Sequence, residues 1–303
     1  MPIILPDGLA SAALLRREGI EVLNAPPVGD TVLRIGLLNL MPDKTSTEAQ
    51  FARLLGATRQ PVELVLGLPC SHRPGVEGTE RYGRWSATSL PRKLDGLIVT
   101  GAPLEHVPFE DVIYWRELVE ICDWAATHVG STIYVCWAAF AALWRFHGVP
   151  LRMLPRKLFG IFAQQVMAVR EPLLDGLGIT FACAVSRHAE VSASDVPWQR
   201  GLACLAQSPR SGLCLIGDER RNALYMFNHL EYDADTLGLE YVRDRSRRAD
   251  VSLPENYWPD DDLSKHPPFT WRRPAEKFFA NWLASLADRR RAQARSRYRA
   301  ALV

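Results

Sequence analysis

The sequence has no long apolar run and almost no excess of one charge. No window approaches 18 uncharged apolar residues, and the N-terminal stretch 1–7 lacks the basic start and sustained apolar core of a signal peptide. The 303 residues carry 36 Lys and Arg against 34 Asp and Glu, a net charge of +2, which gives no general attraction to nucleic acid or membranes. We therefore expect a cytoplasmic protein with neither kind of partner.

Cysteine is scarce, and the usual cofactor motifs are missing. The six cysteines are irregularly spaced and none forms a CxxC pair, which argues against a disulfide scaffold and against a zinc site. Neither a Walker-type phosphate loop nor a GxGxxG motif opening a first helix is present. We expect no metal site and no bound cofactor.

What is present is an alternation of strands and helices. The content of 48% hydrophobic and 23% charged residues suits one large core. Apolar runs predict strands at 33–40, 62–66, 94–100, 131–135, 178–185, 212–216 and 222–228. Helical spacing predicts helices at 9–17, 112–126, 137–144 and 274–286, and one that begins at a Thr45-x-x-Glu48 capping box. The alternation predicts a doubly wound, mostly parallel α/β sheet, with an antiparallel extension from the later strands.

The chain divides into three unequal parts. Residues 1–30 are expected to form an N-terminal arm, 31–287 a single α/β domain, and 288–303 a basic C-terminal tail that is solvated or disordered. The Gly- and Ser-containing stretch 69–91 is expected to be a long surface excursion over one end of the sheet.

Cys136 occupies a corner between a strand and a helix. It follows the β-rich run 131–135 and precedes the apolar segment 137–144. Such an elbow presents a side chain above the sheet edge beside the positive end of a helix, and this setting activates thiols as nucleophiles. The alternative for Cys136 is an inert cysteine in an apolar core.

His229 and Glu231 follow another expected strand end. Ligands of open α/β sheets bind beyond the carboxyl ends of the strands, so His229 and Cys136 are expected to meet there. Residues two apart on an extended segment face the same side, so Glu231 can hold the imidazole of His229. The alternative is a satisfied histidine beside a solvated glutamate. Together the three residues predict a Cys-His-Glu triad.

Several motifs occur in one order between Pro2 and Leu286. Together they resemble the MetA-type homoserine O-acyltransferases of methionine biosynthesis. The motifs are Leu-Leu-Asn-Leu-Met-Pro at 37–42, Thr-Gly-Ala-Pro at 100–103, 132–137, Lys-Leu-Phe-Gly at 157–160, Ser-Arg-His-Ala-Glu at 186–190 and Asn-His-Leu-Glu-Tyr-Asp at 228–233. The resemblance implies a class I glutamine-amidotransferase-like, flavodoxin-like core and a cytoplasmic homodimer.

The resemblance also implies roles for individual residues. Cys136 would be the acyl-thioester nucleophile, His229 the proton acceptor and Glu231 its partner, while Lys157, Ser186 and Arg243 would lie in the substrate pocket. An arginine fork suits the carboxylate of an amino-acid acceptor. By composition alone, Arg243 would be a surface residue of an arginine-rich loop.

Glu105 bears on the acyl donor. Family members that use acetyl-CoA tend to have Glu at this position, and those that use succinyl-CoA tend to have Gly. A carboxylate there would repel the free carboxylate of a succinyl group. We therefore expect acetyl-CoA as co-substrate and L-homoserine as acceptor, with succinyl-CoA as the alternative donor.

Some positions depart from the family pattern. Phe140 replaces a common Gln, and Ala163 and Gln164 replace a Glu-His pair, so L-serine remains an alternative acceptor. A glutamine amidotransferase-like hydrolase with the same triad and a regulatory protein without chemistry are more remote alternatives.

Overall fold

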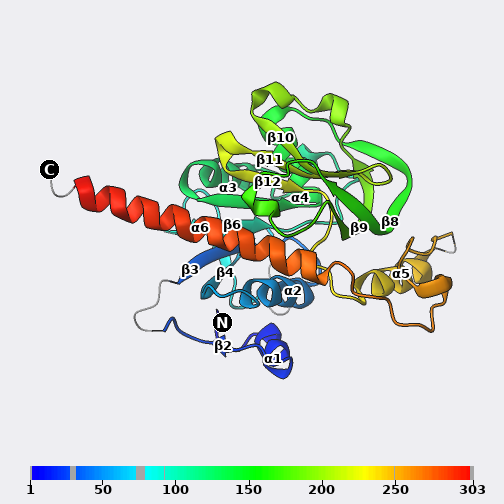
Figure 1. Cartoon of the computed structure of the whole chain (residues 1–303), viewed down its shortest axis with the longest axis horizontal. Coiled ribbons are helices and arrows are strands. Elements are labelled where there is room, and N and C mark those ends of the chain that lie inside the picture. Colours follow the sequence, from blue (N-terminus) through cyan, green and yellow to red (C-terminus); the bar gives the residue numbers. More distant parts are fainter. Residues whose placement is uncertain (1, 28–31, 73–78, 92, 249, 301–303) are drawn as a thin grey trace.

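The computed structural model describes residues 2–27, 32–72, 79–91, 93–248 and 250–300. The strands are β1 (Ile3–Ile4), β2 (Val22–Leu23), β3 (Leu33–Leu38), β4 (Val62–Pro69), β5 (Gly83–Trp85), β6 (Gly96–Val99), β7 (Ser131–Val135), β8 (Arg152–Val166), β9 (Thr180–Glu190), β10 (Leu202–Ser208), β11 (Gly212–Asp218) and β12 (Ala223–Met226). The α-helices are α1 (Ala10–Arg17), α2 (Lys44–Gly56), α3 (Trp115–His128), α4 (Trp137–His147), α5 (Thr236–Arg247) and α6 (Arg272–Ala300). Figure 1 shows their arrangement.

The described strands form one sheet with a parallel half and an antiparallel half. The order is β2-β1-β4-β3-β6-β7-β12-β11-β10-β8-β9, with β5 paired to β4. All pairings from β2 to β12 are parallel, and those from β12 to β9 are antiparallel. The expected doubly wound, mostly parallel sheet with an antiparallel extension is confirmed.

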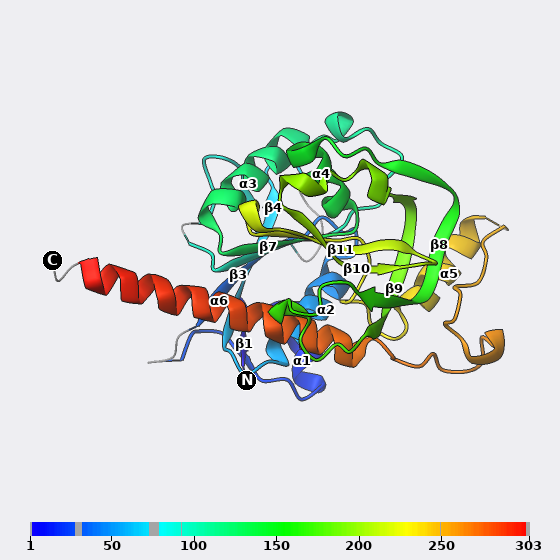
Figure 2. The ribbon, with the colours of Figure 1, turned by 45° about the horizontal axis from the view of Figure 1, so that its top comes forward.

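Helices cover both faces of the parallel half. Helices α3 and α4 lie on one face, and α2 and α6 lie on the other (Figure 2). Strand β7 is buried along its whole length because it lies between these two layers. Its carboxyl end leads directly into α4, which places residue 136 at the carboxyl-terminal end of the parallel strands.

The antiparallel half curls back toward the parallel half. The backbone N–H of His229, just after β12, donates to the carbonyl of Ala184 on β9 at 2.8 Å. Since β12 itself pairs with β11, the two edges of the antiparallel half meet at this point. The curl brings β9 beside the end of β12, although no single motif in the sequence predicts it.

Several expected boundaries were wrong. Strands β8 and β10 and helix α5 were not expected, and the long excursion at 69–91 contains β5, whose Trp85 is buried. The N-cap of α2 is Asp43, whose carboxylate accepts the N–H of Ser46 at 2.9 Å, so the Thr45 capping box is not formed. Glu48 is instead buried and accepts a hydrogen bond from Tyr82 at 2.9 Å.

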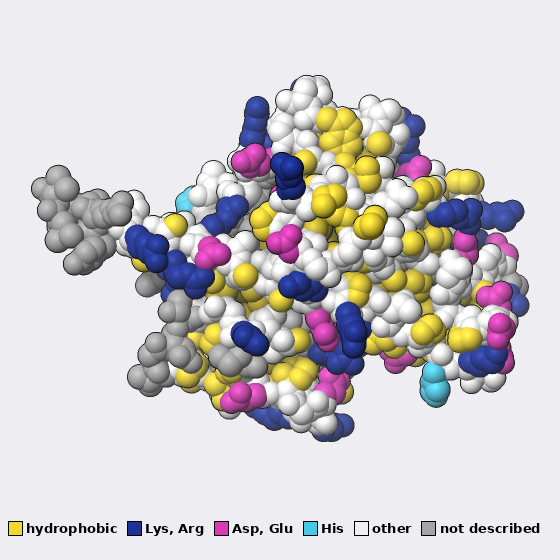
Figure 3. Space-filling model, in the orientation of Figure 1, with side chains coloured by type: hydrophobic (Ala, Val, Ile, Leu, Met, Phe, Trp, Pro, Cys, Tyr) yellow, Lys and Arg dark blue, Asp and Glu magenta, His cyan; other side chains and the backbone are white. Residues whose placement is uncertain are grey.

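The two ends of the chain are more ordered than a loose arm and tail. Strands β1 and β2 of the arm add to the edge of the sheet beside β4. The closing helix does not end at residue 286, because α6 continues to Ala300 and projects beyond the body (Figures 1 and 3). Arg290 donates to the carbonyl of Val32 at 2.6 Å, and Arg289 to that of Gly130 at 2.8 Å. These arginines therefore bind the amino ends of β3 and β7, opposite the edge that carries Cys136.

Candidate active site

Cys136 lies in a strained turn between β7 and α4. Its φ is 49° and its ψ is −116°, a conformation that costs a non-glycine residue about 1–3 kcal/mol. Two backbone hydrogen bonds fix the turn. The N–H of Cys136 donates to the carbonyl of Met226 at 2.7 Å, and the carbonyl of Cys136 accepts from the N–H of Ala139 at 3.0 Å. The strain and the helix N-terminus are the features expected of a nucleophile elbow.

Gly101 allows the loop after β6 to approach this turn. A Cβ atom at Gly101 would lie 3.1 Å from the Cβ of Cys136, closer than most side chains tolerate. The first turn of α4 also leaves N–H groups without partners inside the helix. Cys136 is therefore surrounded by backbone rather than by bulky side chains on these sides.

His229 and Glu231 are brought together as expected. The Nδ1 atom of His229 lies 2.6 Å from Oε1 of Glu231, and both side chains are buried. Burial lowers the pKa of His229, but the charge of Glu231 and the charge and hydrogen bond of Cys136 raise it well above its usual value. The imidazole therefore interacts with both other members of the predicted triad.

Tyr232 orients the imidazole from one side. Its ring stacks on His229 with centroids 4.1 Å apart and planes 20° from parallel. The hydroxyl of Tyr232 donates to Oε1 of Glu240 at 2.7 Å, so the tyrosine also contacts a second group of polar side chains.

That second group, called here the acceptor cluster, consists of Lys157, Ser186, Glu240 and Asp244. Lys157 Nζ lies 3.1 Å from Glu240 and 3.0 Å from Asp244, and the Ser186 hydroxyl donates to Glu240. Burial raises the pKa of Glu240, but the charge of Lys157 and the hydrogen bonds from Ser186 and Tyr232 outweigh it and hold the pKa below its usual value. The cluster therefore retains a partly buried, charged carboxylate beside the triad.

Arg243 lies at the rim of the acceptor cluster. It is on α5 rather than in a loop, and its guanidinium pairs with Asp244 at 2.8 Å. Its side chain is 53% exposed, so the guanidinium retains access to solvent and to ligands. Lys157 and Ser186 contact Glu240 directly, whereas the ion pair of Arg243 is with Asp244.

Glu105 lies beside the face of β9 that carries Ser186 and His188. It is partly buried. Burial lowers the pKa of the nearby His188, and the negative charge of Glu105 opposes part of this change. The positive charge of Lys157 also lowers the pKa of His188. Ser186 and His188 lie on one face of β9 because they are two residues apart. Glu105 therefore adjoins the same face of β9 as the acceptor cluster.

Sequence reasoning missed Glu240, Asp244 and Tyr232. Glu240 and Asp244 are four residues apart on α5 and so lie on one helix face. Such a pair of acidic residues soon after the His229 segment was a usable signal. The tyrosine gave none, because aromatic residues near strand ends are common in cores.

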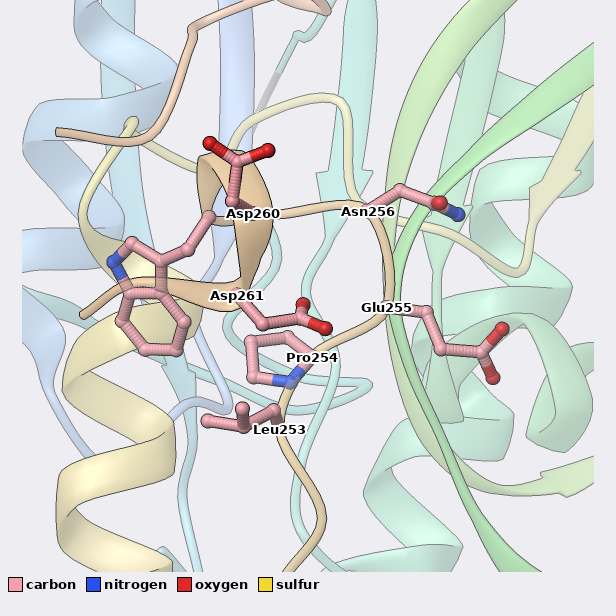
Figure 4. A pocket seen from close by; sticks show the side chains of 7 residues that line it. Leu253, Pro254, Glu255, Asn256, Asp260 and Asp261 are labelled. Atoms are coloured by element: carbon pink, nitrogen blue, oxygen red, sulfur yellow. The ribbon is translucent and has the colours of Figure 1, made fainter. Parts of the chain in front are cut away.

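A separate hollow of about 440 Å³ lies in the loop between α5 and α6. Its lining is acidic and includes Glu255, Asp260 and Asp261, and none of the predicted site residues takes part. Figure 4 shows the Asp261 side chain pointing toward Pro254, whereas that of Glu255 points away from it.

No helix in the described part of the chain is long and apolar enough to cross a membrane.

Solved structures share the fold at low sequence identity. A glutamine amidotransferase from Methylobacillus flagellatus matches with a TM-score of 0.54 and 14% identity, covering 85% of this chain and 96% of that chain. A glutamine amidotransferase from Thermotoga maritima matches with a TM-score of 0.51 and 10% identity, covering 85% and 97%. These likenesses confirm the expected amidotransferase-like core.

Relatives in sequence are much closer. A homoserine O-acetyltransferase from Brucella melitensis is 43% identical over 290 residues, covering 93% of this chain and 94% of the relative. One from Chelativorans sp. is 42% identical, covering 93% of each. The profile described as "HTS: Homoserine O-succinyltransferase" matches residues 2–291. The resemblance seen in the motifs is thereby confirmed, and the chain belongs to the homoserine O-succinyltransferase family of acyltransferases.

Proposed function

We propose that this protein transfers an acetyl group from acetyl-CoA to the side-chain hydroxyl of L-homoserine, in methionine biosynthesis, through a thioester on Cys136. The observation that carries the proposal is the 2.6 Å contact of His229 with Glu231 beside the strained elbow of Cys136, whose charge contributes to the raised pKa of the imidazole. A thiol, an imidazole and a carboxylate in this order suit acyl transfer.

In the first half-reaction, the Cys136 thiolate attacks the carbonyl carbon of the acetyl thioester. The tetrahedral intermediate collapses with cleavage of the carbon–sulfur bond to CoA, and His229 gives its proton to the departing CoA thiolate. The partnerless N–H groups at the start of α4 supply donors for the oxyanion. Acetylation removes the sulfur charge that raised the pKa of His229, so the imidazole is left neutral.

In the second half-reaction, neutral His229 accepts the proton of the homoserine hydroxyl. The hydroxyl oxygen attacks the acetyl carbon, the bond to Cys136 breaks, and the thiolate re-forms beside the new imidazolium. Glu231 holds the imidazole in the required tautomer through its 2.6 Å contact with Nδ1. Because CoA leaves before homoserine reacts, the kinetics are ping-pong.

The acceptor cluster and Arg243 suit the two charged ends of an amino acid. Glu240 is a partly buried, charged carboxylate and attracts the ammonium group, while Arg243 is more exposed and attracts the carboxylate. Ser186 and Lys157 position the substrate through their contacts with Glu240. L-Serine has the same functional groups and is the alternative acceptor.

Glu105 favours acetyl-CoA over succinyl-CoA in this proposal. The family profile bears the succinyl name, whereas the relatives from Brucella and Chelativorans bear the acetyl name. A succinyl carboxylate about 4 Å from Glu105 would be repelled by up to about 4 kcal/mol at an effective dielectric constant near 20.

A homodimer, a cytoplasmic location and the absence of a bound cofactor remain part of this proposal. Size-exclusion chromatography with light scattering tests the dimer. A mass near 34 kDa, the mass of one chain, would contradict it.

Intact-protein mass spectrometry tests the covalent step. Brief mixing with acetyl-CoA, without acceptor, is expected to add one acetyl group to the wild-type protein, and homoserine is expected to remove it. Cys136→Ala is expected to take up none. Cys204→Ala is a matched control, since Cys204 is a partly buried cysteine on β10 outside the site.

Two outcomes would contradict the proposal. One is an unmodified wild-type protein that nevertheless forms O-acetylhomoserine, and the other is unchanged turnover by Cys136→Ala. Release of ammonia from glutamine, without a need for acyl-CoA, would favour the amidotransferase-like alternative.

A further inference from the structure

Tyr232 directly follows Glu231 of the triad and is held at both ends. It is 4% exposed, and its backbone carbonyl accepts a hydrogen bond from the indole N–H of Trp271 at 2.8 Å. At its other end, the hydroxyl donates to Oε1 of Glu240 at 2.7 Å. Burial and the charge of Glu240 raise the pKa of Tyr232 well above its usual value, so the phenol stays protonated and remains a donor. The ring is therefore fixed in place by contacts on both sides.

The ring of Tyr232 supports His229 in a direction that Glu231 does not. The 2.6 Å contact of Nδ1 with Glu231 fixes the imidazole along one line, but a single hydrogen bond leaves the imidazole free to tilt about that line. The phenol ring blocks this tilt because it stacks on the imidazole, with centroids 4.1 Å apart and planes 20° from parallel. Since Nδ1 faces Glu231, Nε2 is the nitrogen left to exchange protons with the sulfur and the acceptor. A displacement of about 1 Å at such an atom can cost about 10²-fold in rate.

Glu240 connects the same tyrosine to the acceptor cluster. Its Oε1 atom accepts from Tyr232, while its Oε2 atom accepts from the hydroxyl of Ser186 and lies 3.1 Å from Nζ of Lys157. Tyr232 thus contacts a member of the triad through its ring and a member of the acceptor cluster through its hydroxyl.

We propose that Tyr232 is a positioning residue with two separable parts. Its ring directs the imidazole of His229 in both half-reactions, and its hydroxyl holds Glu240 in position for the ammonium group of the acceptor. The face of a phenol ring also attracts the positive charge of the imidazolium, which forms each time the histidine accepts a proton. The proposal rests on the proposed function and adds to it a link between proton transfer and acceptor binding.

Two substitutions separate the ring from the hydroxyl. Tyr232→Leu removes both, and it is expected to slow acetyl-enzyme formation and acetyl transfer to homoserine by about 10- to 100-fold each. Tyr232→Phe keeps the ring, so acetyl-enzyme formation should stay within about twofold of the wild-type rate, while the KM for homoserine rises about tenfold through the loss of a bond to a charged group. Rapid mixing followed by intact-protein mass spectrometry measures each step.

Tyr225→Phe is the matched control for the loss of a hydroxyl. Tyr225 also donates to a carboxylate, that of Asp218 at 3.1 Å, outside both the triad and the acceptor cluster, and both steps should keep their wild-type rates. A double variant, Tyr232→Phe with Glu240→Gln, tests whether the hydroxyl acts through Glu240. Its KM for homoserine is expected to equal that of Glu240→Gln alone, because the two side chains are in contact.

Wild-type rates in a folded Tyr232→Leu protein, judged by circular dichroism, would overturn the role of the ring. If that variant does not fold, Tyr232→Met replaces it in the same comparison. An unchanged KM in Tyr232→Phe, or a KM in the double variant that multiplies the two single effects, would overturn the role of the hydroxyl. A wild-type protein that takes up no acetyl group from acetyl-CoA would instead refute the proposed function itself.

Discussion

The triad and the acceptor cluster differ in how the chain assembles them. The triad uses two short segments at the ends of adjacent parallel strands, with Cys136 after β7 and His229 and Glu231 after β12. The acceptor cluster draws Lys157 from β8, Ser186 from β9 and two carboxylates from α5. The triad depends on the parallel half of the sheet. The acceptor cluster forms beside it only because the antiparallel half curls back toward the parallel half.

The two regions also differ in what their charges do. In the proposed reaction, charge moves within the triad, since the sulfur would lose its charge on acetylation and regain it on release. In the acceptor cluster, Lys157 holds Glu240 ionised throughout. The difference predicts that changes in the triad slow bond formation in both half-reactions, whereas changes in the cluster affect mainly the acceptor.

The largest effect is expected from Glu231→Gln. The amide keeps the shape of the side chain but no longer stabilises the imidazolium or fixes its tautomer, and analogous changes in other triads cost about 10⁴ in turnover. Stopped-flow measurement of acetyl-enzyme formation and of its reaction with homoserine should show both steps slowed. Glu219→Gln, which changes an exposed glutamate in the turn between β11 and β12, is the matched control. A loss confined to one step would contradict the division between the regions.

The donor preference should respond next most strongly, through Glu105→Gly. Removal of the carboxylate relieves up to about 4 kcal/mol of repulsion, so the succinyl-to-acetyl ratio of kcat/KM is expected to rise by roughly 10²–10³. Competition between the two CoA esters measures the ratio directly. Glu110→Gly removes an exposed acidic residue from the same loop region and should leave the ratio unchanged. A ratio that does not move in Glu105→Gly would show that the donor is selected elsewhere.

Much of the triad was predictable, because each residue lies at the end of a short apolar strand. The turn at Cys136 follows from local sequence, and two-residue spacing sufficed to join His229 to Glu231. The parallel order of the sheet followed from the alternation of strands and helices, and the structure confirms it.

The acceptor cluster was not predictable in the same way. Lys157 lies in β8, a strand of fifteen residues with a register shift, and its pattern of buried and exposed positions is irregular. The contact with Glu240 depends on the curl of the antiparallel half, which long-range pairing determines. Only the resemblance to the family placed Lys157, Ser186 and Arg243 in one pocket.

A smaller effect is expected from Glu240→Gln. The loss of one charge-assisted contact with the ammonium group is expected to raise the KM for homoserine about 10- to 100-fold. The rate of acetyl-enzyme formation should remain that of the wild type, which single-turnover mass spectrometry measures. A comparable loss in that first step would mean that the acceptor cluster also serves the triad.

The smallest kinetic effect is expected at a buried carboxylate outside both regions. Glu48 accepts hydrogen bonds from Ser11 and Tyr82, and burial raises its pKa from 4.5 to about 7. The folded protein therefore holds this proton more tightly than the unfolded chain, and stability is lost as pH rises from about 4.5 to about 7.

Glu48→Gln should remove that loss, because the amide does not ionise. Urea unfolding at pH 8 is expected to give a free energy of unfolding about 3 kcal/mol higher than that of the wild type, with no gain at pH 4. A gain that does not depend on pH would point to better packing rather than to ionisation. Turnover by Glu48→Gln at pH 8 should equal that of the wild type. A change in turnover would mean that the polar groups around α2 are coupled to the triad. The contrast between the triad and the acceptor cluster would then no longer account for the whole site.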